Sequence, residues 1–91
     1  MTKWLQSGRR RDICVLLYEA ETLRGQRLKT NLEDHYDARI DSQSFYGAME
    51  SLESKGFVEQ RTDGIHDAYA LTDAGERRVE AHFEWMREKV E

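Results

Sequence analysis

The sequence predicts a mainly α-helical domain with a small β-hairpin, an α+β fold, and two observations in the middle of the chain support it. The apolar residues Phe45, Met49 and Leu52 follow one another at i, i+4 and i+7, a spacing that places them on one face of a helix. We expect this helix to cover residues 42–55 and to end at Gly56. The second observation is the change of period that follows it.

The pattern after this helix alternates as a strand does. Residues 57–61 alternate, Asp63-Gly64 is a turn signal, and Tyr69 and Leu71 alternate again. The face of the preceding helix opposite its apolar residues is polar, so it remains free for a partner. A helix with a free polar face beside a hairpin is the reading half of a winged helix-turn-helix, which is the architecture that we predict.

Two helices precede this unit. The first is expected over residues 9–21, with a core stripe at Ile13, Leu16, Leu17 and Ala20. The second is expected over residues 25–36, with a narrow buried face at Leu28, Leu32 and Tyr36. Residues 37–41 form a polar connection around Ile40. We expect a short third strand there, at the edge of the hairpin sheet, which would bury Ile40.

Thr72 is the predicted N-cap of a last helix over residues 73–90, about 27 Å long at a rise of about 1.5 Å per residue. Its apolar residues form a heptad-like seam, Val79, Phe83, Met86 and Val90. Val79 can pack on the chain's own first helix, but the others would be exposed in a monomer. We therefore expect residues 1–72 to form the winged-helix DNA-binding part and residues 73–91 to be a dimerisation helix of the same single domain.

The expected interface of this two-fold dimer combines the seam with aromatic and apolar residues beside it. It consists of Val79, Phe83, Trp85, Met86 and Val90, with Trp4 and Leu5 from the start of the chain covering the partner's seam.

Composition restricts the class of protein. No apolar run approaches the roughly 20 residues that a membrane span needs, so we expect a soluble, cytoplasmic protein with no membrane partner. The single cysteine, Cys14, excludes an internal disulfide and a cysteine-rich zinc site, and we expect a buried thiol. His35, His66 and His82 share no metal-ligand spacing. Because the sequence also lacks a glycine-rich phosphate loop and a nucleophile motif, we predict no metal, no cofactor and no enzymatic activity.

Charge is unusual for a DNA-binding domain, because 18 acidic residues outnumber 14 basic ones and the net charge is -4. The bases are clustered, however, near the start of the chain and on the second helix, whereas the acids crowd the last helix. Ten arginines against four lysines, the absence of proline and the many acids suggest a salt-loving source. At high salt, counterion release adds little to affinity for DNA.

Three stretches resemble a known family. LLYEAETLRGQRL resembles the short first helix and glycine-initiated second helix of the PadR-like winged-helix transcriptional regulators, SFYGAMESLESKGFVE resembles their tyrosine and leucine signature, and YALTDAGE resembles their closing motif. The resemblance spans residues 12–85 and is strongest to the small members with a single C-terminal dimerisation helix. It implies a DNA-binding transcriptional regulator. Regulators of the MarR and ArsR kinds remain possible neighbours.

The sequence departs from the family in two places. Gly47 stands where the family usually has proline, and Ile65, His66 and Asp67 stand where its second wing strand usually carries arginine or lysine. A glycine on the free face of the helix permits close approach to DNA, although it costs about 1 kcal/mol of helix stability relative to alanine. The second departure weakens the usual contact between wing and phosphate.

Candidate DNA contacts follow from these patterns. Residues in the first turns of the central helix are placed to enter the major groove, and glutamine can pair with adenine: Gln43, Ser44, Tyr46 and Gly47. Gln43 and Ser44 can equally be capping residues beside Ser42 or Asp41, and Tyr46 can be half core. Four basic residues are candidates for backbone contacts, or are simply solvated: Arg39, Lys55, Arg61 and His66.

The predicted function is sequence-specific regulation of transcription, as a repressor that binds a pseudo-palindromic operator in double-stranded DNA as a homodimer. The alternative is a winged-helix protein-interaction module whose acidic faces bind a basic partner without direct contact to DNA. The family resemblance also implies a small aromatic effector at the dimer interface, where Phe83, Trp85 and Trp4 would line a pocket or, alternatively, serve only in packing.

Overall fold

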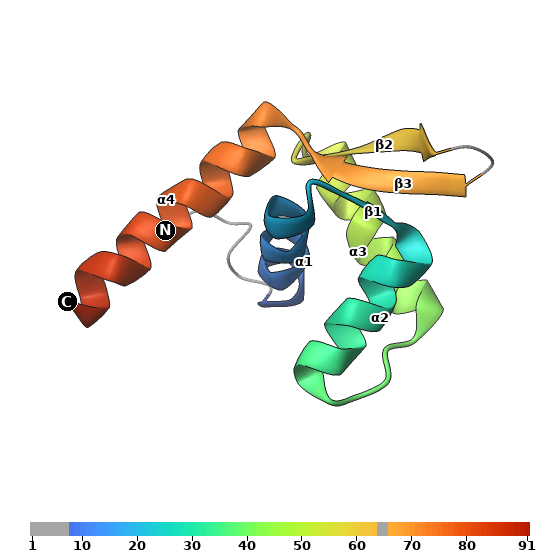
Figure 1. Ribbon diagram of the computed structural model, residues 1–91, viewed down its shortest axis with the longest axis horizontal. Helices are drawn as coiled ribbons and strands as arrows, with labels where there is room; N and C mark the ends of the chain where they lie inside the picture. Colours follow the sequence, from blue (N-terminus) through green and yellow to red (C-terminus); the bar gives the residue numbers. More distant parts are fainter. Residues whose placement is uncertain (1–7, 64–65) are drawn as a thin grey trace.

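The computed structural model describes residues 8–63 and 66–91, with the side chains of Asp63 and His66 left out. Its elements follow in the order α1 (Gly8–Ala20), β1 (Thr22–Arg24), α2 (Gly25–Tyr36), α3 (Ser42–Ser54), β2 (Val58–Asp63), β3 (His66–Leu71) and α4 (Asp73–Val90). Helices α1 to α3 form a compact body, and the β2–β3 hairpin and α4 extend from it to opposite sides (Figure 1). This is a winged helix, so the predicted fold class is confirmed.

The core lies between the three body helices, the inner face of the sheet and the start of α4. From α3 it receives Phe45, Met49 and Leu52, all fully buried, as their spacing predicts. From α1 it receives Ile13, Cys14 and Leu17, whereas Ala20, predicted as core, is exposed. The reason is local. Glu21 has a positive φ of 70° that turns the chain out of α1 into β1, so the last turn of α1 leaves the core.

Cys14 of α1 and Tyr36 of α2 connect α1 with its surroundings, one in the core and the other at the surface. Cys14 is buried, as predicted, and burial raises the pKa of its thiol to about 12. Tyr36, at the end of α2, is partly exposed rather than buried, and its hydroxyl donates a hydrogen bond to the Asp12 carboxylate of α1. The predicted narrow face of α2 is thus buried at Leu28 and Leu32, while Tyr36 joins the two helices at the surface.

The third strand of the sheet is β1, and its predicted position at residues 37–41 is wrong. β1 pairs antiparallel with β3, with Leu23 opposite Tyr69, so the strand order is β1-β3-β2. Residues 37–41 form a loop instead. Asp37 caps α2 in the left-handed conformation, and the backbone N–H of Ile40 bonds to a side chain rather than to a strand. The predicted burial of Ile40 is nevertheless confirmed.

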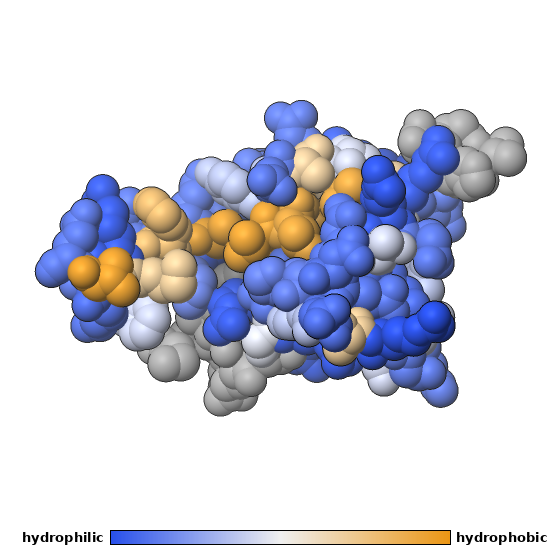
Figure 2. Space-filling view, turned by 60° about the horizontal axis from the view of Figure 1, so that its bottom comes forward, coloured by the Kyte–Doolittle hydropathy of each residue, from blue (hydrophilic) through white to orange (hydrophobic). Residues whose placement is uncertain are grey.

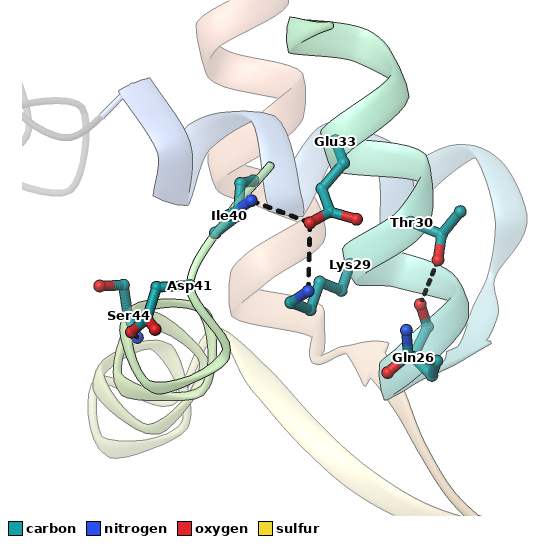
Figure 3. Close-up of polar contacts among 7 residues, drawn as sticks. All are labelled: Gln26, Lys29, Thr30, Glu33, Ile40, Asp41 and Ser44. Atoms are coloured by element: carbon teal, nitrogen blue, oxygen red, sulfur yellow. Dashed lines mark hydrogen bonds and ion pairs between the residues drawn. The ribbon is translucent and has the colours of Figure 1, made fainter. Parts of the chain in front are cut away.

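Glu33 of α2 fixes the loop that leads into α3. One oxygen of its carboxylate accepts hydrogen bonds from the backbone N–H of Ile40 at 2.8 Å and from Nζ of Lys29 at 3.1 Å (Figure 3). The first of these bonds is the main reason why the pKa of Glu33 is lowered. Directly after this loop, Asp41 caps α3 by accepting from the backbone N–H of Ser44 at 3.1 Å. The start of α3 is therefore held to α2 by defined polar contacts.

Thr72 fixes the direction of α4, as its predicted role as N-cap requires. Its Oγ1 accepts from the backbone N–H of Gly75 at 3.1 Å and donates to the carbonyl oxygen of Gly56 at 2.6 Å. A Cβ atom on Gly75 would lie only 2.1 Å from the carbonyl oxygen of Phe57. Only glycine therefore permits α4 to start this close to the base of the wing.

None of the helices in the described residues is long and apolar enough to cross a membrane. Within residues 8–63 and 66–91, no three or more His, Cys, Asp or Glu side chains are grouped so that they could hold a metal ion.

Removing the charge of Glu33 is expected to destabilise the fold in a pH-dependent way. The pKa of Glu33 lies below its ordinary value of 4.5 in the folded chain. Its carboxylate therefore stabilises the fold above that pH, and the contribution disappears as the pH falls through the folded-state pKa. The loss of unfolding free energy in Glu33→Gln, measured with urea between about pH 7 and about pH 3, should shrink toward acid. Asp34→Asn, which removes an exposed carboxylate of α2, is the control; an equal loss in both variants contradicts the assignment.

Two glycine substitutions are expected to have opposite effects on stability. Gly75→Ala places a methyl group against the Phe57 carbonyl and should destabilise the domain by about 2 kcal/mol or more. Gly47→Ala adds a methyl group on α3 where no atom lies within 4 Å, and it should stabilise the helix by about 1 kcal/mol. Thermal melts of both variants beside the wild type test the pair. A stable Gly75→Ala variant would refute the close approach.

Candidate nucleic-acid interface

The exposed face of α3 is polar and open. Burial of Phe45, Met49 and Leu52 turns the opposite side of the helix outward, and its exposed residues are Gln43, Tyr46, Gly47, Glu50 and Ser54. A side chain at Gly47 would meet nothing within 4 Å. The middle of this face is therefore flat, and no packing inside the chain accounts for the glycine.

Gln43 and Ser44 are both exposed in the first turn of α3. The N-cap of α3 is Asp41, whose carboxylate accepts a hydrogen bond from the backbone N–H of Ser44. The side chains of Gln43 and Ser44 do not serve as the cap. They extend from the end of the helix that a winged helix presents to the major groove.

Tyr46 joins α3 to the start of α2. Its ring is 39% exposed and packs edge-to-face on Phe45, with the ring centres 4.9 Å apart. Its hydroxyl lies so close to Gly25 that a Cβ atom there would be 2.9 Å away. The prediction of a half-core tyrosine describes this position well, since one side of the ring packs and the other is accessible.

A shallow depression of about 540 Å³ lies between the start of α2, Tyr46 and β3. Its lining is mostly polar or basic: Arg24, Gly25, Gln26, Arg27, Thr30, Tyr46, Asp67 and Tyr69. No side chain caps α2, because its N-cap residue, Arg24, makes no capping hydrogen bond. The depression therefore combines backbone N–H groups at a helix start with the basic side chains of Arg24 and Arg27, which suit phosphate oxygens, and with one acidic side chain, Asp67.

Sequence reasoning missed this part of the surface. The bases of the second helix were visible in the sequence, but their neighbours were not. Arg27 is exposed beside Tyr46 in the depression, whereas Lys29 is engaged by Glu33 at 3.1 Å. The available signal was the glycine at the start of α2, because Gly25 is what allows the Tyr46 hydroxyl to approach.

Arg39 and Lys55 are exposed at the two ends of α3, in the loop before it and at its C-cap. The basic residues of the wing are placed differently. Gln60 faces α3, because its side chain donates a hydrogen bond to Glu53. Arg61, the next residue of β2, lies opposite Ala68 and therefore points to the other face of the sheet. Arg61 also forms an ion pair with Glu59 at 2.9 Å. The structure thus separates Arg61 from the exposed face of α3, and the side chain of His66 lies outside the described residues.

The predicted seam on α4 divides into a buried and an exposed part. Val79 is 8% exposed and packs into the core, whereas exposure reaches 56% at Phe83, 47% at Trp85, 43% at Met86 and 83% at Val90. Figure 2 shows an apolar band that runs from the C-terminal end of α4 toward the middle of the molecule. Trp4 and Leu5, predicted to cover the partner's seam, lie outside the described residues.

A groove of about 610 Å³ continues this seam between α1 and α4. Its apolar lining includes Val15, Tyr18, Val79, Phe83 and Met86. On its edge, the Tyr18 hydroxyl donates to a Glu80 oxygen at 2.8 Å. His82 also lines it, with a buried Nδ1 atom that has no hydrogen-bond partner among the described residues, and burial lowers the pKa of this imidazole.

Comparison with known proteins identifies the family. No protein-family model and no curated protein matches the chain. Among solved structures, RosR from H. salinarum superposes with a TM-score of 0.85 at 30% identity, over 91% of this chain and 76% of that one.

Two more distant structures share the fold alone. The homodimeric winged helix-turn-helix DNA-binding domain of Mb0332 from Mycobacterium bovis, a possible ArsR-family transcriptional regulator, has a TM-score of 0.72 at 22% identity, over 96% of this chain and 74% of that one. F93 from STIV, a winged-helix DNA-binding protein, has a TM-score of 0.71 at 17% identity, over 99% of this chain and 96% of that one. With the fold, the open polar face of α3 and the likeness to RosR in agreement, the chain belongs to the family of RosR, among the winged-helix DNA-binding transcriptional regulators.

Proposed function

We propose that this regulator is a sequence-specific repressor that binds a pseudo-palindromic operator in double-stranded DNA as a homodimer. The observation that carries the proposal is the division of the molecule: α3, which has an open polar face, lies within the body, whereas the end of α4, which carries the exposed apolar seam, projects away from it (Figure 1). One surface can thus meet DNA while the other meets a second copy. Two copies related by a two-fold axis present their α3 helices to successive major grooves, about 34 Å apart.

Bases are read by the first turns of α3. Gln43 and Ser44 are exposed there, and the bare backbone at Gly47 lets the helix approach the groove floor closely. An amide side chain pairs with the N6 and N7 atoms of adenine. Tyr46 flanks these residues, and its accessible hydroxyl lies beside the depression at the start of α2.

Phosphates are held by the basic residues around α3. Arg27 and the start of α2 contact one backbone segment, while Arg39 and Lys55 flank the helix. From the wing we keep Arg61 as a candidate contact, and His66 stays a prediction because its side chain lies outside the described residues. Because Arg61 must first leave Glu59, we assign it a smaller part than Arg27.

The second copy covers the seam of Phe83, Trp85, Met86 and Val90, together with the groove between α1 and α4. An exposed apolar surface of this kind is typical of an interface. The buried Nδ1 atom of His82 lacks a partner within the described chain, and a donor from the second copy would satisfy it. The groove is also where a small aromatic effector would bind, but its continuity with the exposed seam favours the second copy as its occupant.

Two finer assignments belong to the same proposal. The PadR-like character rests on the motifs around Tyr46 and Thr72. A salt-loving source rests on the arginine and acid content. The alternative of a protein-interaction module is not favoured, because the membership of the chain in a DNA-binding family speaks against it.

Separating base contacts from phosphate contacts tests the DNA surface. Gln43→Ala should reduce discrimination at one base pair of each half-site by about tenfold or more, with little change on unrelated DNA. Arg27→Ala should weaken binding to all sequences about equally and reduce the salt dependence by about one phosphate contact. Fluorescence anisotropy titrations at several salt concentrations measure both effects. Unchanged binding in both variants would remove α3 and α2 from the interface.

Introducing a charge into the seam tests the dimer. Phe83→Glu places a carboxylate in the apolar interface and should yield a monomer in light scattering, because an unpaired buried charge is costly. Ala81→Glu adds the same charge to an exposed position on another side of α4 and should remain dimeric. A Phe83→Glu variant that stays dimeric would place the interface elsewhere.

A further inference from the structure

We propose that Glu50 is a specificity-determining residue: its carboxylate accepts a hydrogen bond from the exocyclic amine of a cytosine in the operator and disfavours other DNA. The inference rests on the proposed function, since it requires that α3 enter the major groove. It assigns a role to a side chain that an interface with DNA would otherwise be expected to exclude.

Glu50 lies in the middle of the exposed face of α3. It follows Gly47 by three residues, Tyr46 by four and Gln43 by seven, so all four residues share one side of the helix. The opposite side is fixed by complete burial of Phe45, Met49 and Leu52. A helix that presents Gln43 and Gly47 to the groove therefore also presents Glu50.

Glu50 carries a charge that nothing in the described chain compensates. Several other acidic side chains do have partners: Glu33 is bound by Lys29, Glu53 accepts from Gln60, and Glu59 pairs with Arg61. For Glu50, no hydrogen bond or ion pair with any residue of 8–63 or 66–91 is found. The residues one turn away on α3 are Tyr46, Gly47, Glu53 and Ser54, and none of them is basic. Its carboxylate is thus available to a ligand.

The chemistry of the groove selects the ligand. A carboxylate only accepts hydrogen bonds, and the donors in the major groove are the N4 amine of cytosine and the N6 amine of adenine. The remaining groups at the base edges are acceptors or methyl groups, and phosphates carry negative charge, so all of these disfavour a carboxylate. Cytosine is the established base partner of acidic side chains. Glu50 therefore weakens non-specific binding and strengthens discrimination.

The helix geometry also predicts where this cytosine lies. Seven residues separate Gln43 from Glu50, which corresponds to about 10.5 Å along the helix. At about 3.4 Å per base pair, a helix lying along the groove would place the two contacted bases at most about three base pairs apart. Gly47 lies between the two and, without a side chain, leaves room for both to reach the bases. The half-site should contain a cytosine within about three base pairs of the base that Gln43 reads.

The test is a binding selection from random double-stranded DNA, followed by titration of the selected operator, of its cytosine-substituted form and of unrelated DNA. Wild type, Glu50→Gln and the control Glu88→Gln are compared. Glu88 is an exposed acid of α4, so its substitution changes the net charge equally. A conservative change at an exposed position keeps the fold intact, which thermal melts verify.

We expect the wild type to lose about tenfold or more in affinity when the cytosine is replaced, and Glu50→Gln to lose this preference while binding unrelated DNA more tightly than the control. If Glu50→Gln selects the same operator with the same discrimination, the inference is overturned and the proposed function stands. If Glu88→Gln relaxes discrimination as much as Glu50→Gln does, net charge explains the effect and the inference is likewise overturned. If the wild type selects no sequence, the proposed function fails as well.

Discussion

Burial of Phe45, Met49 and Leu52 fixes the rotation of α3 about its own axis, and the remaining surface features depend on that rotation. With these three side chains fully enclosed, the helix has one orientation in which Gln43, Gly47 and Glu50 face outward. A rotation by one residue, about 100°, would expose an apolar side chain and bury a polar one. The polar contacts at the start of α3 then set its position along the axis, through Glu33 in α2 and the cap at Asp41. The proposed DNA-reading surface is thus a consequence of core packing.

The two proposed interfaces, for DNA and for a second copy, lie on different parts of the molecule. On one side, α3 and the start of α2 form a surface of polar, basic and aromatic residues. On the other side, α4 extends past the body, and its apolar residues beyond Val79 are left uncovered (Figure 2). A domain of 91 residues has a small core, so in the proposed dimer burial of this seam against a second copy would contribute stability as well as symmetry. Two of the acids outside α3 are neutralised by ion pairs, Glu33 with Lys29 and Glu59 with Arg61.

Much of the fold follows from local sequence patterns. The helices α2, α3 and α4, the hairpin and the cap at Thr72 are recognisable because their signals are short in range: apolar spacing, capping residues and turn residues. The third strand is the main error. Three residues, Thr22–Arg24, form it, and a strand this short is defined by its partner β3 rather than by its own pattern. Residues 37–41 show an equally weak strand pattern, but the backbone N–H groups of Asp37, Ala38 and Ile40 bond to α2.

Some features of the candidate site likewise follow from the sequence, whereas others depend on the tertiary structure. The sequence by itself determined which residues of α3 and α4 are apolar and which are polar, and hence the free face and the seam, because helical periodicity depends on the order of residues alone. The tertiary structure decided which other residues join them. It placed Arg27 beside Tyr46 and turned Arg61 to the opposite face of the wing. It also left Glu50 without a partner on the reading face. These relations join residues that are distant in the chain, so they depend on how helices and strands pack, and no local pattern records them.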